Sequence, residues 1–126
     1  MKYVILIHAD PQPWGHPTTP LTAEGRAVAT DDLAAMDKEF EALLTEISAS
    51  GELVTAEALA APQESTIFRW RKGGPSASEG PFAEVQEQLA GFFLIDVATR
   101  ERAEEIAAQF AGPGSPAELR PAFVWE

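Results

Sequence analysis

EGPFAEVQEQLAGFFLI, residues 79–95, is the stretch of this sequence that says most about the fold. Its opening Glu79-Gly80-Pro81 is typical of a tight turn, because glycine and proline both favour turn conformations. Amide and carboxylate side chains follow. The run then enters a segment, Gly91–Val97, that is apolar on both sides of an extended chain. We therefore expect a strand here, at the centre of a sheet whose two faces are both covered.

Two helices and a second central strand are predicted elsewhere. Lys2–His8 repeats the two-sided apolar pattern of a central strand. A helix is expected from Thr30 or Asp31, either of which can cap it, to Ser50, with Gly51 ending it in a left-handed conformation. A second helix follows a Thr99 cap and ends at Gly112-Pro113-Gly114. The side chains expected to face the core from these helices are Leu33, Met36, Phe40, Leu43, Leu44, Ile47, Ala103, Ile106, Ala107 and Phe110.

The remaining segments complete a regular order of elements. Glu52–Leu59, Ser65–Lys72 and Glu118–Trp125 are predicted strands. Gly73-Gly74 indicates a hairpin turn, after which residues 75–79 return as a short peripheral arm. Pro121 cannot donate a hydrogen bond to a neighbouring strand and therefore indicates an edge position or an irregularity.

This order is β-α-β, an inserted hairpin, then β-α-β. It predicts one α+β domain over residues 1–126, a ferredoxin-like sandwich with an antiparallel sheet. Two helices can cover only one face of such a sheet, although both central strands are apolar on both faces. We therefore expect a homodimer whose sheets pack face to face.

Composition and charge narrow the class of protein. Twenty acidic residues against nine basic ones give a net charge of −11, which argues against nucleic acid and anionic membranes as partners. The chain has no cysteine, so neither disulfides nor thiolate metal sites are possible. No apolar stretch approaches the roughly 20 residues that span a bilayer. We expect a cytoplasmic protein.

The pattern of these segments resembles the DGPF branch of the YCII-related family. Glu79-Gly80-Pro81-Phe82 matches its signature, with glutamate in place of the usual aspartate, and Ala83 to Phe92 matches the segment that follows. Asp10, Gly51 and the Thr66 to Arg69 strand fit the rest of the pattern. The resemblance implies a dimeric α+β barrel with a cleft near the subunit interface. Some YCII-related proteins resemble enzymes with a histidine–acid pair, but their histidine has no clear counterpart here.

His8 and Asp10 are the first candidates for chemistry. Residues i and i+2 of a strand share a face, so an extended chain would place the imidazole beside the carboxylate. An acid in that position would orient the ring for general acid–base catalysis. The alternative is structural: His8 ends a buried strand, and Asp10 caps the loop that begins at Pro11.

Glu79 is the third catalytic candidate. Its carboxylate could act as a base in a cleft, or it could accept hydrogen bonds from the turn that it precedes. Gly80, Pro81 and Phe82 are expected to be architectural. Gln88 is a candidate for ligand binding, or for fixing the loop through a hydrogen bond to the backbone.

Arg69, Arg71 and Trp14 are further candidates for binding a ligand. The two arginines could hold a carboxylate or phosphate, or they could protect an edge strand by their charge. Trp14 lies in the proline-rich segment 10–21, which could be a lid, a partner surface or a loose loop.

Two functions remain open. The first is a small enzyme that acts on a small organic molecule by acid–base chemistry, without a cofactor or a metal, through His8, Asp10 and Glu79. The second is a non-catalytic module that binds a small ligand or has a regulatory role. The spacing of histidines and acids matches none of the common metal-binding patterns.

Overall fold

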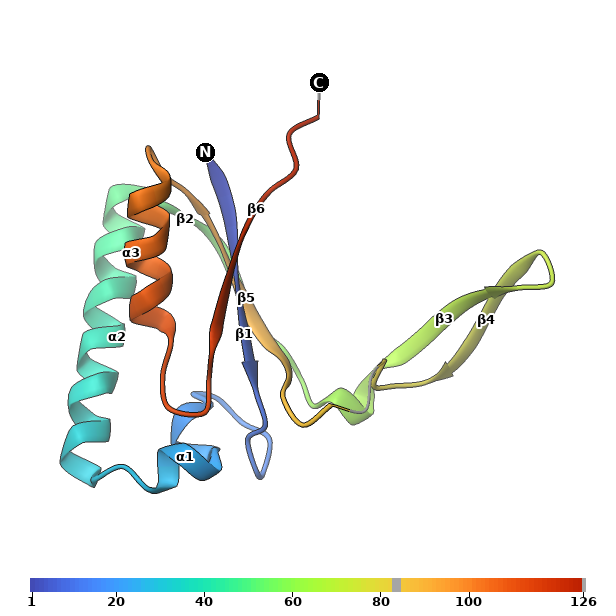
Figure 1. Cartoon of the computed structure of the whole chain (residues 1–126), viewed down its shortest axis with the longest axis horizontal. Helices are drawn as coiled ribbons and strands as arrows, with labels where there is room; N and C mark the ends of the chain where they lie inside the picture. Colours follow the sequence, from blue (N-terminus) through green and yellow to red (C-terminus); the bar gives the residue numbers. More distant parts are fainter. Residues whose placement is uncertain (83–84, 126) are drawn as a thin grey trace.

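The computed structural model describes residues 1–82 and 85–125. Ala83 and Glu84, within the run quoted above, and Glu126 lie outside the described residues. The chain forms a four-stranded antiparallel sheet, helices against one of its faces, and a separate two-stranded hairpin (Figure 1). The strands of the sheet, in the order in which they lie side by side, are β2 (Leu53–Ala58), β5 (Gln88–Asp96), β1 (Lys2–Ala9) and β6 (Ala117–Pro121).

The order of the elements confirms the predicted α+β, ferredoxin-like class. One helix, α2 (Thr30–Ser50), connects β1 to β2, and another, α3 (Arg100–Phe110), connects β5 to β6. The hairpin of β3 (Thr66–Arg71) and β4 (Gly74–Glu79) is inserted between β2 and β5. The short elements are η1 (Thr19–Leu21), α1 (Ala23–Arg26) and η2 (Pro62–Glu64). The pairing of two such sheets into a barrel stays a prediction.

The helix ends follow local chemistry, with one exception. Gly51 ends α2 with φ of 81°, the predicted left-handed conformation. The Thr99 hydroxyl accepts a hydrogen bond from the Arg102 amide at 3.1 Å, so its predicted capping of α3 is confirmed. The predicted cap of α2 by Thr30 or Asp31 is wrong. Both residues already lie inside the helix, and the capping position is held by Ala29, which has no side-chain acceptor.

The core lies between the helices and one face of the sheet. Phe93 of β5 stacks on Phe110 of α3, with centroids 4.1 Å apart, and Phe40 of α2 meets Phe110 edge-on at 5.4 Å. Met36, predicted to face the core, is 39% exposed, because the first turns of α2 reach past the end of the shorter α3 (Figure 1). The buried cluster consists of Tyr3, Ile5, Leu43, Ile47, Ile95, Val97, Ala103, Ile106, Ala107 and Phe110.

The opposite face of the sheet carries apolar side chains from its two central strands. Val4 lies across from Leu94, and Leu6 lies across from Phe92, so these four side chains share a face. All four are half-buried. The two long helices lie over the other face (Figure 1). We refer to this second surface as the open face.

The β3–β4 hairpin extends away from the sheet (Figure 1). Its turn is centred on Lys72 and Gly73, which have φ of 51° and 82°, and Arg71 pairs with Gly74. The hairpin was predicted, but the turn lies one residue earlier than the expected Gly73-Gly74. A lysine in the left-handed region is uncommon, so the two glycines were the stronger signal.

Two predicted strand bounds differ from the structure by three residues or more. β5 begins at Gln88, three residues before the expected Gly91. β6 ends at Pro121 and does not continue to Trp125. Proline lacks the N–H that would extend the pairing with β1, and β6 is an edge strand as Pro121 indicated.

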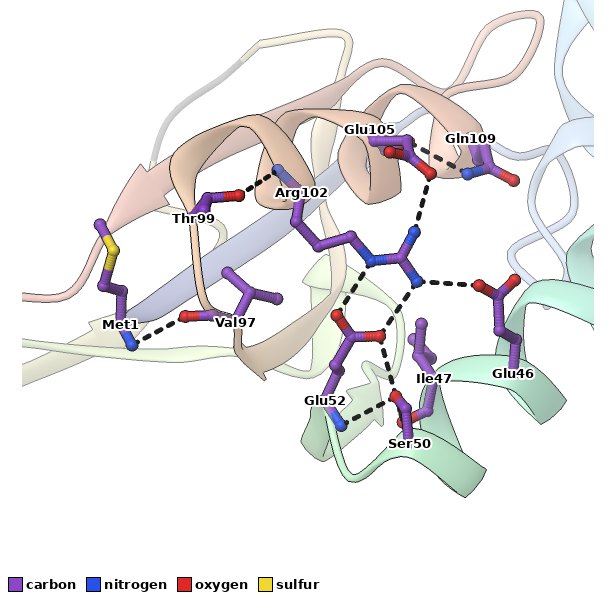
Figure 2. Close-up of polar contacts among 10 residues, drawn as sticks. All are labelled: Met1, Glu46, Ile47, Ser50, Glu52, Val97, Thr99, Arg102, Glu105 and Gln109. Atoms are coloured by element: carbon purple, nitrogen blue, oxygen red, sulfur yellow. Dashed lines mark hydrogen bonds and ion pairs between the residues drawn. The ribbon is translucent and has the colours of Figure 1, made fainter.

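Arg102 of α3 joins three segments of the chain through its guanidinium (Figure 2). Its Nε and Nη2 donate to the two carboxylate oxygens of Glu52 at 2.9 and 3.0 Å. Nη2 also donates to Glu46 at 2.9 Å, and Nη1 to Glu105 at 2.8 Å. The hydrogen bond from Arg102 lowers the pKa of Glu52 below its ordinary value, and the bond from the Ser50 hydroxyl makes a smaller contribution in the same direction. This cluster fixes α3 to the end of α2 and the start of β2.

Candidate functional site

His8 lies near the end of β1, on the open face. Its Nε2 is 3.1 Å from Oε1 of Glu118 in the neighbouring edge strand β6. Leu6 lies across from Glu118 in the antiparallel pairing of β1 with β6. His8 is two residues further along β1 and therefore on the same face as Leu6, so its side chain can reach Glu118. The side chains are 32% and 39% exposed, so the pair is reachable from solvent while its geometry is held by the sheet.

Glu118 also forms an ion pair with Arg120, two residues along the same strand. The hydrogen bond from Arg120, and to a smaller extent the one involving His8, lower the pKa of the Glu118 carboxyl below its ordinary value. Glu118 is therefore ionised at neutral pH. A carboxylate at Nε2 favours the tautomer with its proton on that nitrogen, which leaves Nδ1 as the nitrogen able to accept a proton.

A hollow of about 360 Å³ lies beside the start of β5, and neither His8 nor Glu118 is among its described lining residues. Leu89 of β5 lines the hollow and lies across from His8 in the strand register, so it is the residue that connects the pair to the hollow. The hollow lies between the end of β2, the η2 turn and the base of the hairpin. Its lining is mostly apolar and consists of Leu59, Ala60, Ala61, Pro62, Glu64, Ser65, Ile67, Pro81, Phe82, Gln88 and Leu89. A volume of this size suits a small organic molecule.

Asp10 does not pair with His8 in the structure. Its Oδ1 accepts a hydrogen bond from Gln12 Nε2 at 2.8 Å, and its side chain lines a separate hollow of about 100 Å³ together with Thr22 and Glu24. β1 ends at Ala9. The alternation of a regular strand therefore does not reach Asp10, and Glu118 is the carboxylate that contacts the imidazole.

Trp14 is hydrogen-bonded to Leu59, which lines the larger hollow. Its indole N–H donates to the Leu59 carbonyl at 2.9 Å, and Nε2 of His16 meets the same oxygen at 2.8 Å. The two rings contact each other edge-on, with centroids 6.2 Å apart. These bonds fix the proline-rich segment to the end of β2, beside the lining of the hollow.

The other predicted residues belong to the hairpin and its base. Glu79 is exposed at the end of β4, across from Thr66, and does not contribute to the described lining of the hollow. Arg69 lies over the Phe82 ring, 5.2 Å from its centroid, and Arg71 is exposed beside the turn.

Gln88 lines the hollow and donates from Nε2 to the Val85 carbonyl at 2.8 Å. The predicted hydrogen bond to the loop backbone is therefore confirmed. The ligand-binding role of Gln88 stays a prediction.

Glu118 is the residue that sequence reasoning missed. Its signal was indirect: a ferredoxin-like order places the last strand beside the first, so an acid in the last strand can reach a histidine in the first. Among residues 1–82 and 85–125, no group of three or more histidine and acidic side chains is placed to hold a metal ion. None of the described helices is long and apolar enough to cross a membrane.

Comparison with known proteins gives two matches. The model of a family described as the YCII-related domain matches residues 1–118. The chain is also similar to the uncharacterised protein R00369 of Rhizobium meliloti (strain 1021), with 30% identity over 99 residues. That alignment covers 71% of this chain and 80% of the relative.

Proposed function

The chain belongs to the YCII-related domain family, and we propose that it is a small enzyme that uses the His8 imidazole for acid–base chemistry on a small organic molecule. The observation that carries the proposal is the 3.1 Å contact between His8 Nε2 and Glu118 Oε1, next to Leu89, which lines the hollow. A histidine held by a carboxylate beside a cavity is a common arrangement for proton transfer.

In the proposed reaction, Glu118 holds the ring through Nε2 and stabilises the imidazolium. Nδ1 takes a proton from the substrate and returns it to the product. The apolar lining of the hollow, which includes Leu89 and Phe82, receives the carbon skeleton of the substrate. We expect a substrate with an apolar body and one ionisable or polar group.

We further propose that the protein works as a homodimer in which the open faces of two sheets pack together. Support comes from Val4, Leu6, Phe92 and Leu94, which are apolar and only half-buried in one copy. A second sheet over this face would also remove water from the His8–Glu118 pair. Exclusion of water strengthens the electrostatic contribution of such a pair.

Asp10 and Glu79 are proposed to have roles that differ from the role of His8. Asp10 is proposed as a group that holds the loop after β1 through Gln12. Glu79 is proposed as a second acid or base if the dimer brings it toward the substrate. Arg69 and Arg71 are proposed to attract an anionic substrate to the hairpin side of the hollow.

The test begins with a panel of small carboxylic acids, phenols and lactones, screened by thermal shift and then for turnover by proton NMR. For a compound that the wild type converts, we expect His8→Ala to abolish turnover and Glu118→Gln to reduce it roughly a hundredfold. Asp10→Asn is the matched control, and we expect it to retain turnover. Full activity in His8→Ala would overturn the proposal.

A non-catalytic binding module is the second candidate, and the apolar character of the hollow favours it. In this case a compound from the same panel stabilises wild type and His8→Ala equally, and neither protein converts it. A bulky substitution in the hollow, Leu89→Trp, should then abolish the thermal shift.

A further inference from the structure

The β3–β4 hairpin has an apolar surface that is not covered in one copy of the chain. Phe68 is 68% exposed and Trp70 is 76% exposed. Among the described residues, β3 and β4 pair with each other and with no third strand. A two-stranded hairpin is marginally stable in water without further packing. Its aromatic side chains therefore indicate a contact surface.

One face of the hairpin is turned toward the body of its own chain, and the other face is turned away from it. Ile67 and Arg69 share one face, where Ile67 lines the hollow and Arg69 lies over Phe82, so this face is turned toward the body of its own chain. Phe68 and Trp70 lie on the opposite face because side chains alternate along a strand. This second face is directed away from the hollow.

Charge indicates which partner fits. Arg71 and Lys72 are exposed at the turn of the hairpin, whereas Glu79, at the far end of β4, is the one acid in the hairpin. The whole chain carries −11, so the body of a second copy is strongly acidic and attracts a basic hairpin. The same net charge repels nucleic acid, the other common partner of a basic and aromatic hairpin.

We propose that Phe68 and Trp70 dock on a second copy of this chain, so that each subunit of the dimer is clasped by the β3–β4 hairpin of the other. This rests on the dimer put forward under Proposed function. It adds a contact that is separate from the packing of the open faces. A two-fold axis makes the two clasps equivalent.

Sedimentation equilibrium tests the proposal. We expect Phe68→Ser combined with Trp70→Ser to raise the dimer dissociation constant by at least about tenfold, as for the loss of buried aromatic side chains at an interface. Ser76→Thr, on the opposite face of the same hairpin, is the matched control and should change it by less than about twofold.

A cross-link provides a second measurement that does not depend on the double variant folding. The chain has no cysteine, so Ala77→Cys, across from Phe68, introduces a single site for a maleimide–benzophenone label. Irradiation should give a covalent dimer, with peptides from two copies joined.

The outcomes separate the clasp from the dimer. An unchanged dissociation constant in the double variant, or cross-links confined to one chain, would overturn the clasp and leave the dimer standing. Cross-links to an added DNA duplex without covalent dimer would also overturn it. A wild type that stays monomeric would overturn the dimer itself, and the clasp with it.

Discussion

His8 and Glu118, which are 110 positions apart in the sequence, meet across neighbouring strands with Nε2 and Oε1 separated by 3.1 Å. The contact joins the first strand of the sheet to the last. The pairing of these two strands is regular, with Leu6 across from Glu118, so His8 and Glu118 lie on the same face of the sheet. The imidazole is thus oriented by a distant edge strand and not by its neighbour in sequence.

The first prediction concerns the tautomer of His8. With Glu118 at Nε2, the neutral ring should carry its proton on that nitrogen, and nitrogen-15 chemical shifts should report this form. Glu118→Gln should mix the two tautomers, because a neutral amide can donate as well as accept. Asp10→Asn should leave the shifts of His8 unchanged. His16→Gln removes the other histidine and assigns the signals.

A mixed population of tautomers in the wild type would contradict the observed pairing. A change on Asp10→Asn that equals the change on Glu118→Gln would restore Asp10 as the partner expected from the sequence.

The second prediction concerns Arg102. Arg102→Met keeps most of the aliphatic stem but removes the hydrogen bonds to Glu52, Glu46 and Glu105. Arg102 and Glu52 are 22% and 19% exposed, so their paired bonds are partly shielded from water. We expect a loss of about 1–3 kcal/mol in the free energy of unfolding, measured by urea titration. Glu105→Gln is the control, and its exposed pair should contribute less than about 1 kcal/mol.

Sequence patterns predicted the local features of this structure more accurately than the contacts between distant segments. Helical spacing identified Leu43, Ile47, Ile106 and Phe110 as buried, because the period of a helix fixes which residues share a face. The Thr99 cap followed from equally local chemistry. In each case the residues that determine the outcome are close together in the chain.

The candidate site was less accessible to prediction. The contact of His8 with Glu118 depends on which strands become neighbours and on the register of β1 against β6. The turn at Lys72 and Gly73 was misplaced because the pattern favoured two glycines, whereas the pairing of Arg71 with Gly74 fixes the observed turn. Single-residue shifts of this kind move side chains between faces, and local propensity does not determine them.

The third prediction is a change of stability with pH. The hydrogen bond from Arg102 lowers the pKa of Glu52 in the folded state. Such a carboxylate stabilises the fold at pH values above its unfolded pKa, and this contribution is lost as the pH falls through the folded pKa. The stability difference between wild type and Glu52→Gln should therefore be largest near neutral pH and should shrink below about pH 4.

Unfolding in urea at a series of pH values measures this difference. Because both proteins are compared at each pH, titration of Glu46 and Glu105, which also face Arg102, largely cancels. A difference that stays constant from pH 7 to about pH 3 would show that the charge of Glu52 does not contribute.

The fourth prediction concerns Gly91, at the point where the run of residues 79–95 enters the buried part of β5. A Cβ at this position would lie 2.8 Å from the backbone oxygen of Glu57 in the neighbouring strand β2. Backbone in a paired strand cannot move aside easily, so Gly91→Ala should cost roughly 1–3 kcal/mol of unfolding free energy. Gly74→Ala is the matched control: its Cβ would meet nothing within 4 Å, and the change should be smaller than about 0.5 kcal/mol. Equal effects of the two substitutions would show that the close approach of β2 to β5 is not what requires glycine at position 91.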